Sequence, residues 1–319
     1  MLKTNHPKIL HLSGVGLTLF FLGACDSKIE LVEASGLVRI ENQLVIVSDN
    51  EAGALFRYRL SDLDNHNDTG VVLKTISINP VDHQTFTSFN ASDLESVDIL
   101  PNGEIIVLSE QTNALYTKDG IAAQYPDKLA EIAGRGLEGL SVHSNGKIVV
   151  LWEGGYYSLL GMNNDINLPK KPRFCIHTLP KTTDILVCKE NNAIKDLEVP
   201  APPDSSQFFR APDLVWDTDG ASFIVLLASL NAANYSFRYL WLQRFSIEGR
   251  PSGAPINLCD KGMLPGQLRD GPESNIEGLA WFDPGNSLIM INDTNSMATA
   301  AVLSINPWPQ TDNTIACDQ

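Results

Sequence analysis

Pairs of acidic residues recur along this 319-residue sequence with nearly constant spacing. In two copies the acids are fifteen residues apart, and in a third they are sixteen apart. In chain order the pairs are Glu95 with Glu110, Glu138 with Glu153, and Glu277 with Asp293. Carboxylate oxygens are hard ligands that favour Ca2+ over softer metals. If the fold gathers these pairs in one place, they would form a calcium site.

An Asn-Gly dipeptide lies between the acids of each of the first two pairs. Asn-Gly favours a two-residue type I′ turn, so each pair predicts a β-hairpin. With Asn102-Gly103 as the turn, Glu95 and Glu110 become directly opposed partners, and Asn145-Gly146 has the same effect on the second pair. Opposed like charges destabilise a hairpin. Either a cation, a basic side chain or protonation compensates, or both carboxylates extend into water where the hairpin frays.

The acids belong to a longer repeat of two short apolar strands joined by a turn. Copies begin near residues 35, 95, 138, 175, 212 and 277. Six hairpins, each followed by further strand-like runs, predict an all-β fold, a six-bladed β-propeller over residues 35–319. Two gaps of 37 residues are short for a four-stranded blade of roughly 40–50 residues. A five-bladed ring with 175–188 absorbed into its neighbour is therefore the alternative. A β-sandwich is a broader alternative, but a β-sandwich does not predict a repeated motif.

A propeller would bring the acids together. The first strand of each blade lines the central channel, so its start and the end of the second strand share one mouth. The copy at Pro212 lacks both acids, which leaves a gap in the acidic ring. Glu190 of the fourth copy would join the mouth. The predicted metal ligands are Glu95, Glu110, Glu138, Glu153, Glu277, Asp293 and Asp49.

The segments around these acids resemble a known family. The motifs are Asp93–Val97 with Leu100–Gly103, echoed by Gly136–Leu140 and Asn275–Leu279. They are similar to the family described as having esterase-like activity of phytase, and to the related bacterial propellers described as SdiA-regulated. The resemblance covers most of the mature chain and implies a β-propeller with phytase-like or esterase-like activity.

Other features limit the function. The sequence contains no G-x-S-x-G elbow, no phosphate-binding loop, no H-E-x-x-H motif and no EF-hand loop, so the catalytic residues are unknown. Arg57, Arg135 and Lys189 are the basic residues nearest the acidic motifs, which is little positive charge for a polyphosphate. The net charge of -15 argues against nucleic acid as a partner and suits a divalent cation or a basic ligand.

Two functions remain. The first is a non-catalytic lipoprotein that binds a small molecule or a protein at the channel mouth. The second is a Ca2+-dependent phosphoester or carboxyl-ester hydrolase. In that hydrolase the carboxylates hold the metal and one of them acts as a base on water.

The N-terminus predicts a lipid anchor. Two lysines precede the apolar run Leu12–Leu22, which is too short for a permanent membrane span. Leu22–Cys25 resembles a bacterial lipobox, so residues 1–24 would be a signal peptide, Cys25 the lipidated residue and 25–34 a short tether. The alternative is an ordinary secretory signal with a chance cysteine. Asp26 resembles an inner-membrane retention signal. We expect a periplasm-facing protein of the bacterial cell envelope, with the membrane as a partner.

The four cysteines after the lipobox predict two disulfides in an oxidising compartment. With a turn at Lys181-Thr182, Cys175 faces Cys188 across the fourth hairpin, within disulfide reach. Cys259 and Cys317 remain, and this second bond would tie the C-terminus back to the chain and help to close the ring.

Overall fold

The computed structural model describes residues 34–49, 53–59, 74–77, 79–85, 91–126, 136–154, 171–181, 184–190, 192–204, 209–230, 237–260, 276–292 and 299–317. The predicted signal peptide, Cys25, most of the tether and Asp293 lie outside these residues. Among these residues, none lies in a helix with the length and hydropathy of a transmembrane span.

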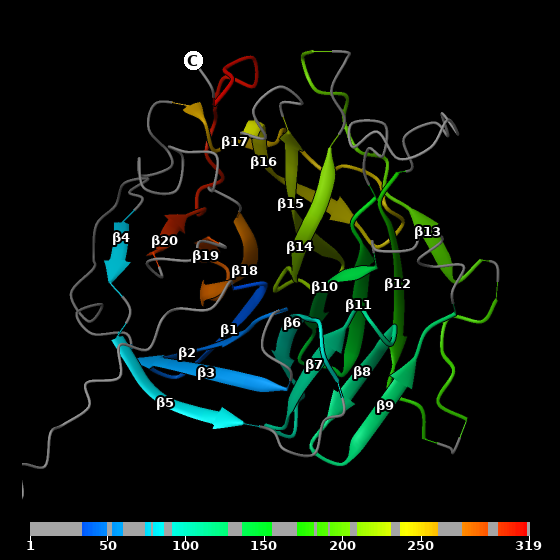
Figure 1. The fold of residues 1–319 in the computed structure, drawn as a ribbon. Helices are drawn as coiled ribbons and strands as arrows, with labels where there is room; N and C mark the ends of the chain where they lie inside the picture. The colour runs from blue at the N-terminus through cyan, green and yellow to red at the C-terminus, as the bar shows by residue number, and fades with distance from the viewer. Residues whose placement is uncertain are drawn as a thin grey trace, which may run out of the picture.

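The strands form five four-stranded antiparallel sheets arranged as blades around a centre (Figure 1). Blade 1 contains β1 (Gly36–Ile40), β2 (Gln43–Val47), β3 (Ala54–Arg59) and β5 (Asn79–Thr85). Blade 2 contains β6 (Leu94–Ile99), β7 (Ile105–Ser109), β8 (Ala114–Thr117) and β9 (Gly120–Gln124). Blade 3 contains β10 (Leu137–Val142), β11 (Lys147–Trp152), β12 (Arg173–Thr178) and β13 (Ile194–Asp196). Blade 4 contains β14 (Arg210–Trp216), β15 (Ser222–Leu230), β16 (Phe237–Ser246) and β17 (Ile256–Asn257). Blade 5 contains β18 (Ile276–Asp283), β19 (Ser287–Asn292), β20 (Thr299–Ser304) and β4 (Lys74–Ser77).

The fold is a five-bladed β-propeller, so the prediction of six blades is wrong and its alternative is correct. The segment 175–188 does not form a hairpin, because both edges of β12 are already occupied. Cys175 pairs with Val150 of β11 on one side and with Ile194 of β13 on the other. Leu186 instead forms a bridge with Gln124 at the outer edge of blade 2.

Apolar residues between neighbouring blades hold the ring together. The second strand of each blade is a nearly continuous buried run, such as Ile148–Trp152 in β11, because both faces of its sheet pack against another blade. The described residues form five clusters of buried side chains, one at each interface between blades. The hydrophobic core is therefore itself a ring, divided into five parts.

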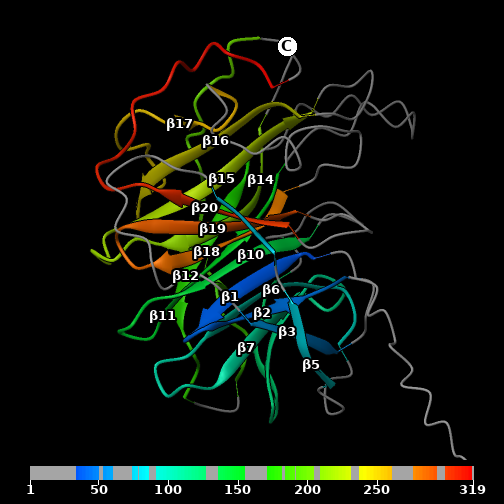
Figure 2. The same ribbon diagram turned by 90° about the vertical axis from the view of Figure 1, so that its left-hand side faces the viewer.

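Strand β4 closes that ring. It lies in the sequence between β3 and β5 of blade 1, yet it pairs with β20 at the outer edge of blade 5 (Figure 2). The first part of the chain thus supplies the outermost strand of the last blade. The expectation that the C-terminal disulfide would help to close the ring needs correction, because hydrogen bonding between β4 and β20 does so.

Both predicted disulfides are present, with Cα–Cα distances of 6.4 Å for Cys175–Cys188 and 4.8 Å for Cys259–Cys317. The hairpin from which the first pairing was inferred does not exist, since Cys188 lies in a loop beyond β12.

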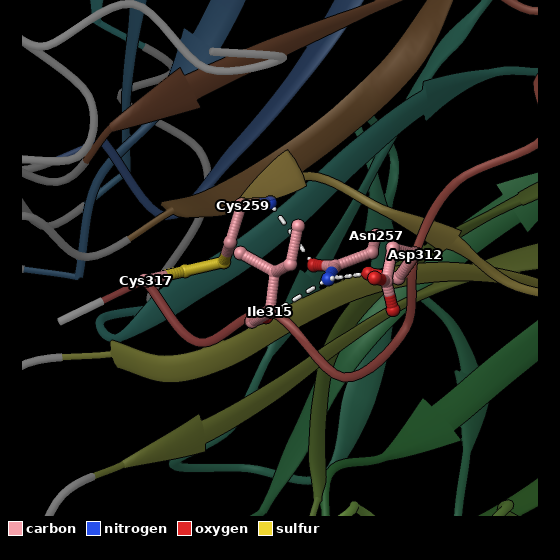
Figure 3. The surroundings of a disulfide bond; sticks show 5 residues. All are labelled: Asn257, Cys259, Asp312, Ile315 and Cys317. Atoms are coloured by element: carbon pink, nitrogen blue, oxygen red, sulfur yellow. Dashed lines mark hydrogen bonds between the residues drawn. A yellow bond between two sulfur atoms is a disulfide. The ribbon is translucent and has the colours of Figure 1, made fainter. Parts of the chain in front are cut away.

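The second disulfide fastens the C-terminal segment to the outer edge of blade 4 (Figure 3). The Asn257 side-chain amide donates hydrogen bonds to the backbone oxygens of Asp312 and Ile315, at 2.7 and 2.9 Å. The backbone N–H of Cys317 donates to the oxygen of Arg238 at 3.0 Å. This segment is therefore attached by covalent and hydrogen bonds together.

Candidate functional site

Three glutamates open the inner strands of their blades at one mouth of the channel. Glu95, Glu138 and Glu277 each occupy the position where the pairing between the first and second strands shifts by one residue. Each is therefore the extra residue of a β-bulge, a feature that redirects a side chain and often lies near functional sites. The repeat recognised in the sequence thus corresponds to a repeated bulge.

The predicted turn geometry is wrong by one residue. The backbone N–H of Leu100 donates to the oxygen of Glu104 at 2.8 Å, so the loop contains three residues, and Gly103 takes the left-handed conformation with φ of 83°. Such a loop combines a type I turn with a glycine bulge. The N–H of Glu110 consequently donates to the oxygen of Asp93 at 2.9 Å, and Glu95 is not its partner. The second hairpin has the same three-residue loop.

The acids nevertheless act on one another across the mouth. Burial and, to a lesser degree, the charges of neighbouring acids together raise the pKa of Glu95 to about 9. These acids are Glu277, Glu110, Asp93 and Asp49. Acids from blades 1, 2 and 5 thus influence one carboxyl group.

Glu138 links blade 3 to the same cluster. Burial raises the pKa of Glu138, and the charges of Glu153, Glu95, Glu110 and Glu277 add to this effect. Of the predicted ligands within the described residues, all six lie in this cluster. Glu190 does not, since it lies in a turn before β13 at the outer edge of blade 3.

Arg210 fills the gap that the sequence suggested in blade 4. Its Nη1 lies 3.2 Å from Glu153 Oε2, and its Nη2 lies 3.2 Å from Glu277 Oε1. Burial opposes its positive charge, but Glu153, Glu277 and Glu138 together hold its pKa above the ordinary value. Blade 4 therefore contributes a cation that joins the acids of the two adjacent blades.

Sequence reasoning missed Arg210 because it lies two residues before the Pro212 copy, outside the compared segment. A basic residue just before the one copy without acids was the available signal. The N–H of Ala211 donates to the backbone oxygen of Glu153 at 2.9 Å, which holds the start of β14 against blade 3.

Among the described residues, Asp93, Glu95 and Glu110 form an acidic group with the spacing of metal ligands. Each presents an oxygen atom, and these atoms all lie within 4.8 Å of one another. Gly136 leaves room for this group, because a Cβ atom there would come within 2.1 Å of Glu110 Cγ. Glu95 is only 7% exposed and forms no hydrogen bond or ion pair within the described part of the chain. A buried carboxylate without a partner is costly unless a proton or a cation neutralises it, and oxygen ligands alone suit Ca2+.

Polar side chains below the mouth tie the inner strands together. Each accepts a hydrogen bond from a backbone N–H of the next blade, over distances of 2.6 to 3.2 Å. The acceptors are Ser96, Asp98, Ser141 and Asp213, and the donors are Leu140, Val142, Trp216 and Leu279 respectively. These bonds fix the relative positions of blades 2 to 5, and hence of the acids above them.

The profile of the phytase-like family, described as esterase-like activity of phytase, matches residues 29–296. No curated protein matches the sequence.

Solved structures match this chain at low sequence identity. A glycosyl hydrolase from Bacteroides ovatus is 12% identical with a TM-score of 0.46, and the match covers 89% of this chain and 87% of that one. Hydrazine synthase from Kuenenia stuttgartiensis is 8% identical with a TM-score of 0.43 over 85% of this chain, which spans only 59% of that protein. Virginiamycin B lyase from Staphylococcus aureus is 11% identical with a TM-score of 0.38, over 87% and 96%.

Proposed function

Because this chain belongs to the phytase-like family, we propose that it is a cell-envelope propeller that binds a ligand or partner at a Ca2+-loaded acidic mouth. The observation that carries this proposal is the environment of the Glu95 side chain. It is a buried carboxyl group with no hydrogen bond or ion pair among the described residues, and four neighbouring acids act on it.

Asp93, Glu95 and Glu110 would hold the metal, since their oxygens already lie close together. Bound Ca2+ would neutralise these charges and attract an anionic group of the ligand. Arg210 forms ion pairs with Glu153 and Glu277. These two acids would therefore line the metal site rather than bind the metal.

Calorimetric titration of the chelator-treated protein with CaCl2 tests the proposal. We expect saturable binding, with at least a tenfold loss of affinity in Glu95→Gln. Glu248→Gln is the matched control, because Glu248 is exposed on the surface and forms an ion pair with Lys195 at 2.9 Å. Absence of Ca2+ binding by the wild-type protein would refute the calcium-loaded mouth.

A second candidate function is Ca2+-dependent hydrolysis of a phosphoester or carboxyl ester. Arg210 favours it, because a guanidinium group among metal-binding acids suits an anionic substrate. In this role Arg210 would orient the substrate anion, and a carboxylate of the mouth would take a proton from water.

p-Nitrophenyl phosphate and p-nitrophenyl acetate, assayed with CaCl2 and with chelator, distinguish the two functions. A hydrolase would show calcium-dependent turnover that falls at least a hundredfold in Glu138→Gln and remains in Glu248→Gln. If Ca2+ binds but neither substrate turns over, the protein is a binding module.

The cell-envelope location rests on the lipobox ending at Cys25. Acyl chains on this residue would place the propeller at the membrane surface. In a membrane fractionation, the wild-type protein should sediment with membranes and Cys25→Ala should not. Equal sedimentation of both proteins would exclude the lipid anchor.

A further inference from the structure

A cavity lies at the end of the channel opposite the acidic mouth. It is formed where the inner strands run into their hairpin turns, and it has a volume of about 720 Å3. Sites for small molecules typically measure about 300–1,000 Å3. Its lining comes from all five blades, from Arg39 in blade 1 to Asp283 in blade 5.

The ionisable residues of this cavity are mostly acidic. The acids are Glu41, Asp98, Asp217 and Asp283, and the basic residues are Arg39 and His143. The Arg39 guanidinium is already engaged, because it donates to the backbone oxygens of Glu41 and Phe282 and lies 4.4 Å from the Phe282 ring centroid. Asp217 has its own cation, since Arg244 Nε lies 2.7 Å from its Oδ2.

Asp98 has no such cation among the described residues. Its Oδ2 accepts hydrogen bonds from the Val142 N–H at 2.6 Å and from Ser141 Oγ at 3.2 Å, and its Oδ1 accepts one from the Ile99 N–H at 2.7 Å. These donors hold the carboxylate in one orientation. A carboxylate oxygen can accept two hydrogen bonds, so Oδ1 retains the capacity for a donor from a ligand.

Aromatic side chains complete the lining. Trp281 is half-buried, and its Nε1–H donates to the backbone oxygen of Trp216 at 2.7 Å, which fixes the indole ring. Phe282 already lies beneath the Arg39 guanidinium. Aromatic rings and a carboxylate that line the same cavity are groups that bind ammonium ions, through cation–π attraction and a charged hydrogen bond.

We propose that this cavity binds an organic ammonium ion, a protonated amine carried on an apolar or aromatic group. A metal ion does not suit it, because the one acidic cluster with metal-ligand spacing in the described residues is that of Asp93, Glu95 and Glu110 at the other mouth. The proposal does not depend on calcium binding.

The test compares phenethylammonium with 2-phenylethanol, which has nearly the same shape and no charge. Both are titrated calorimetrically at pH 8 with chelator present. Burial raises the pKa of Asp98 to about 6, so its carboxylate is charged at that pH. We expect the wild-type protein to bind the ammonium ion at least tenfold more tightly than the alcohol.

Variants locate the site. Asp98→Asn should lose at least tenfold in affinity for the ammonium ion, whereas Glu95→Gln at the acidic mouth should leave it unchanged. Since Asp98 also joins blades 2 and 3, Trp281→Leu is a second variant. It should reduce the preference for ammonium over alcohol at least threefold.

Three results would overturn the proposal. Absence of ammonium binding would show that the cavity is not such a site. Equal affinity for the alcohol would show that the cavity selects apolar shape alone. Loss of binding in Glu95→Gln, with Asp98→Asn unaffected, would assign the ammonium ion to the acidic mouth.

Discussion

The two ends of the channel are built from the same five inner strands, but they treat a carboxyl group differently. Glu95 at the acidic mouth receives no hydrogen bond from the described residues, and burial with four neighbouring acids raises its pKa to about 9. Asp98, nearer the hairpin turns, is also desolvated, but three hydrogen bonds to its carboxylate limit the rise in its pKa to about 6. The donors around a carboxyl group therefore decide whether it is a fixed anion or one that requires a proton or a cation.

The largest expected effect comes from removing the Arg210 cation, which pairs with two acids of the mouth. Arg210→Met would leave Glu153, with a side chain only 3% exposed, and Glu277 without their ion pairs to Arg210. We expect a loss of about 3 kcal/mol in the free energy of unfolding, measured by urea denaturation. The control is Arg250→Met, since the Arg250 side chain is 74% exposed and its ion pair with Glu198 is long, at 3.9 Å. A similar loss in both variants would contradict a special role for Arg210.

Calcium should have the next largest effect, and it should act on one mouth alone. At 100 times its dissociation constant, a ligand that binds only the folded state stabilises it by about 2.7 kcal/mol. Melting curves with CaCl2 and with chelator should therefore differ for the wild-type protein and for Asp98→Asn. At the same calcium concentration, the stabilisation should be smaller by at least about 1.3 kcal/mol in Glu95→Gln, because its affinity falls at least tenfold. A calcium shift of unchanged size in Glu95→Gln would place the metal elsewhere.

A change of one pH unit should alter the free energy of unfolding by less than calcium does. In the folded protein the pKa of Glu95 is raised from 4.5 to about 9, so between these values the folded state holds a proton that the unfolded state has lost. The stability of the calcium-free protein should fall as pH rises through this range, by at most ~1.4 kcal/mol per pH unit from this group. The free energy of unfolding, measured by urea denaturation from pH 5 to pH 8, should depend less steeply on pH in Glu95→Gln than in the wild-type protein. An unchanged slope would mean that Glu95 is charged and compensated in the folded state.

Asp98 should also make stability fall as pH rises, but over a narrower pH range than Glu95. Its folded pKa of about 6 lies above the ordinary value of 3.8, so its contribution falls between about pH 4 and pH 6 and is constant above that. Plots of the free energy of unfolding against pH should be parallel for the wild-type protein and Asp98→Asn from pH 7 to pH 8. Their slopes should differ only below pH 6. Divergence above pH 7 would show that the hydrogen bonds do not hold this pKa down.

Much of the acidic mouth was predictable, because a repeated Glu before a repeated hairpin reports a repeated position in the fold. The hairpin register was not, because Asn-Gly fits a two-residue turn and also the end of a three-residue loop, as at Asn102-Gly103. The blade count failed at Cys175, where a third strand resembles a first one in its apolar pattern. Arg210 was missed because it precedes the Pro212 copy, outside the compared segments, and because its acidic partners lie in the two adjacent blades.

The pairing of β4 with β20 has a consequence for how the chain acquires its structure. Residues 74–77 reach their partner only when residues 299–302 are available, more than 200 positions later. Such a distant contact slows folding, because the intervening chain must be brought together first. Until then the edge of β4 that faces β20 exposes unpaired backbone groups, which can recruit another molecule. A chain truncated before β20 should therefore form β4-mediated oligomers through exchange of this strand, whereas the complete chain satisfies the strand internally.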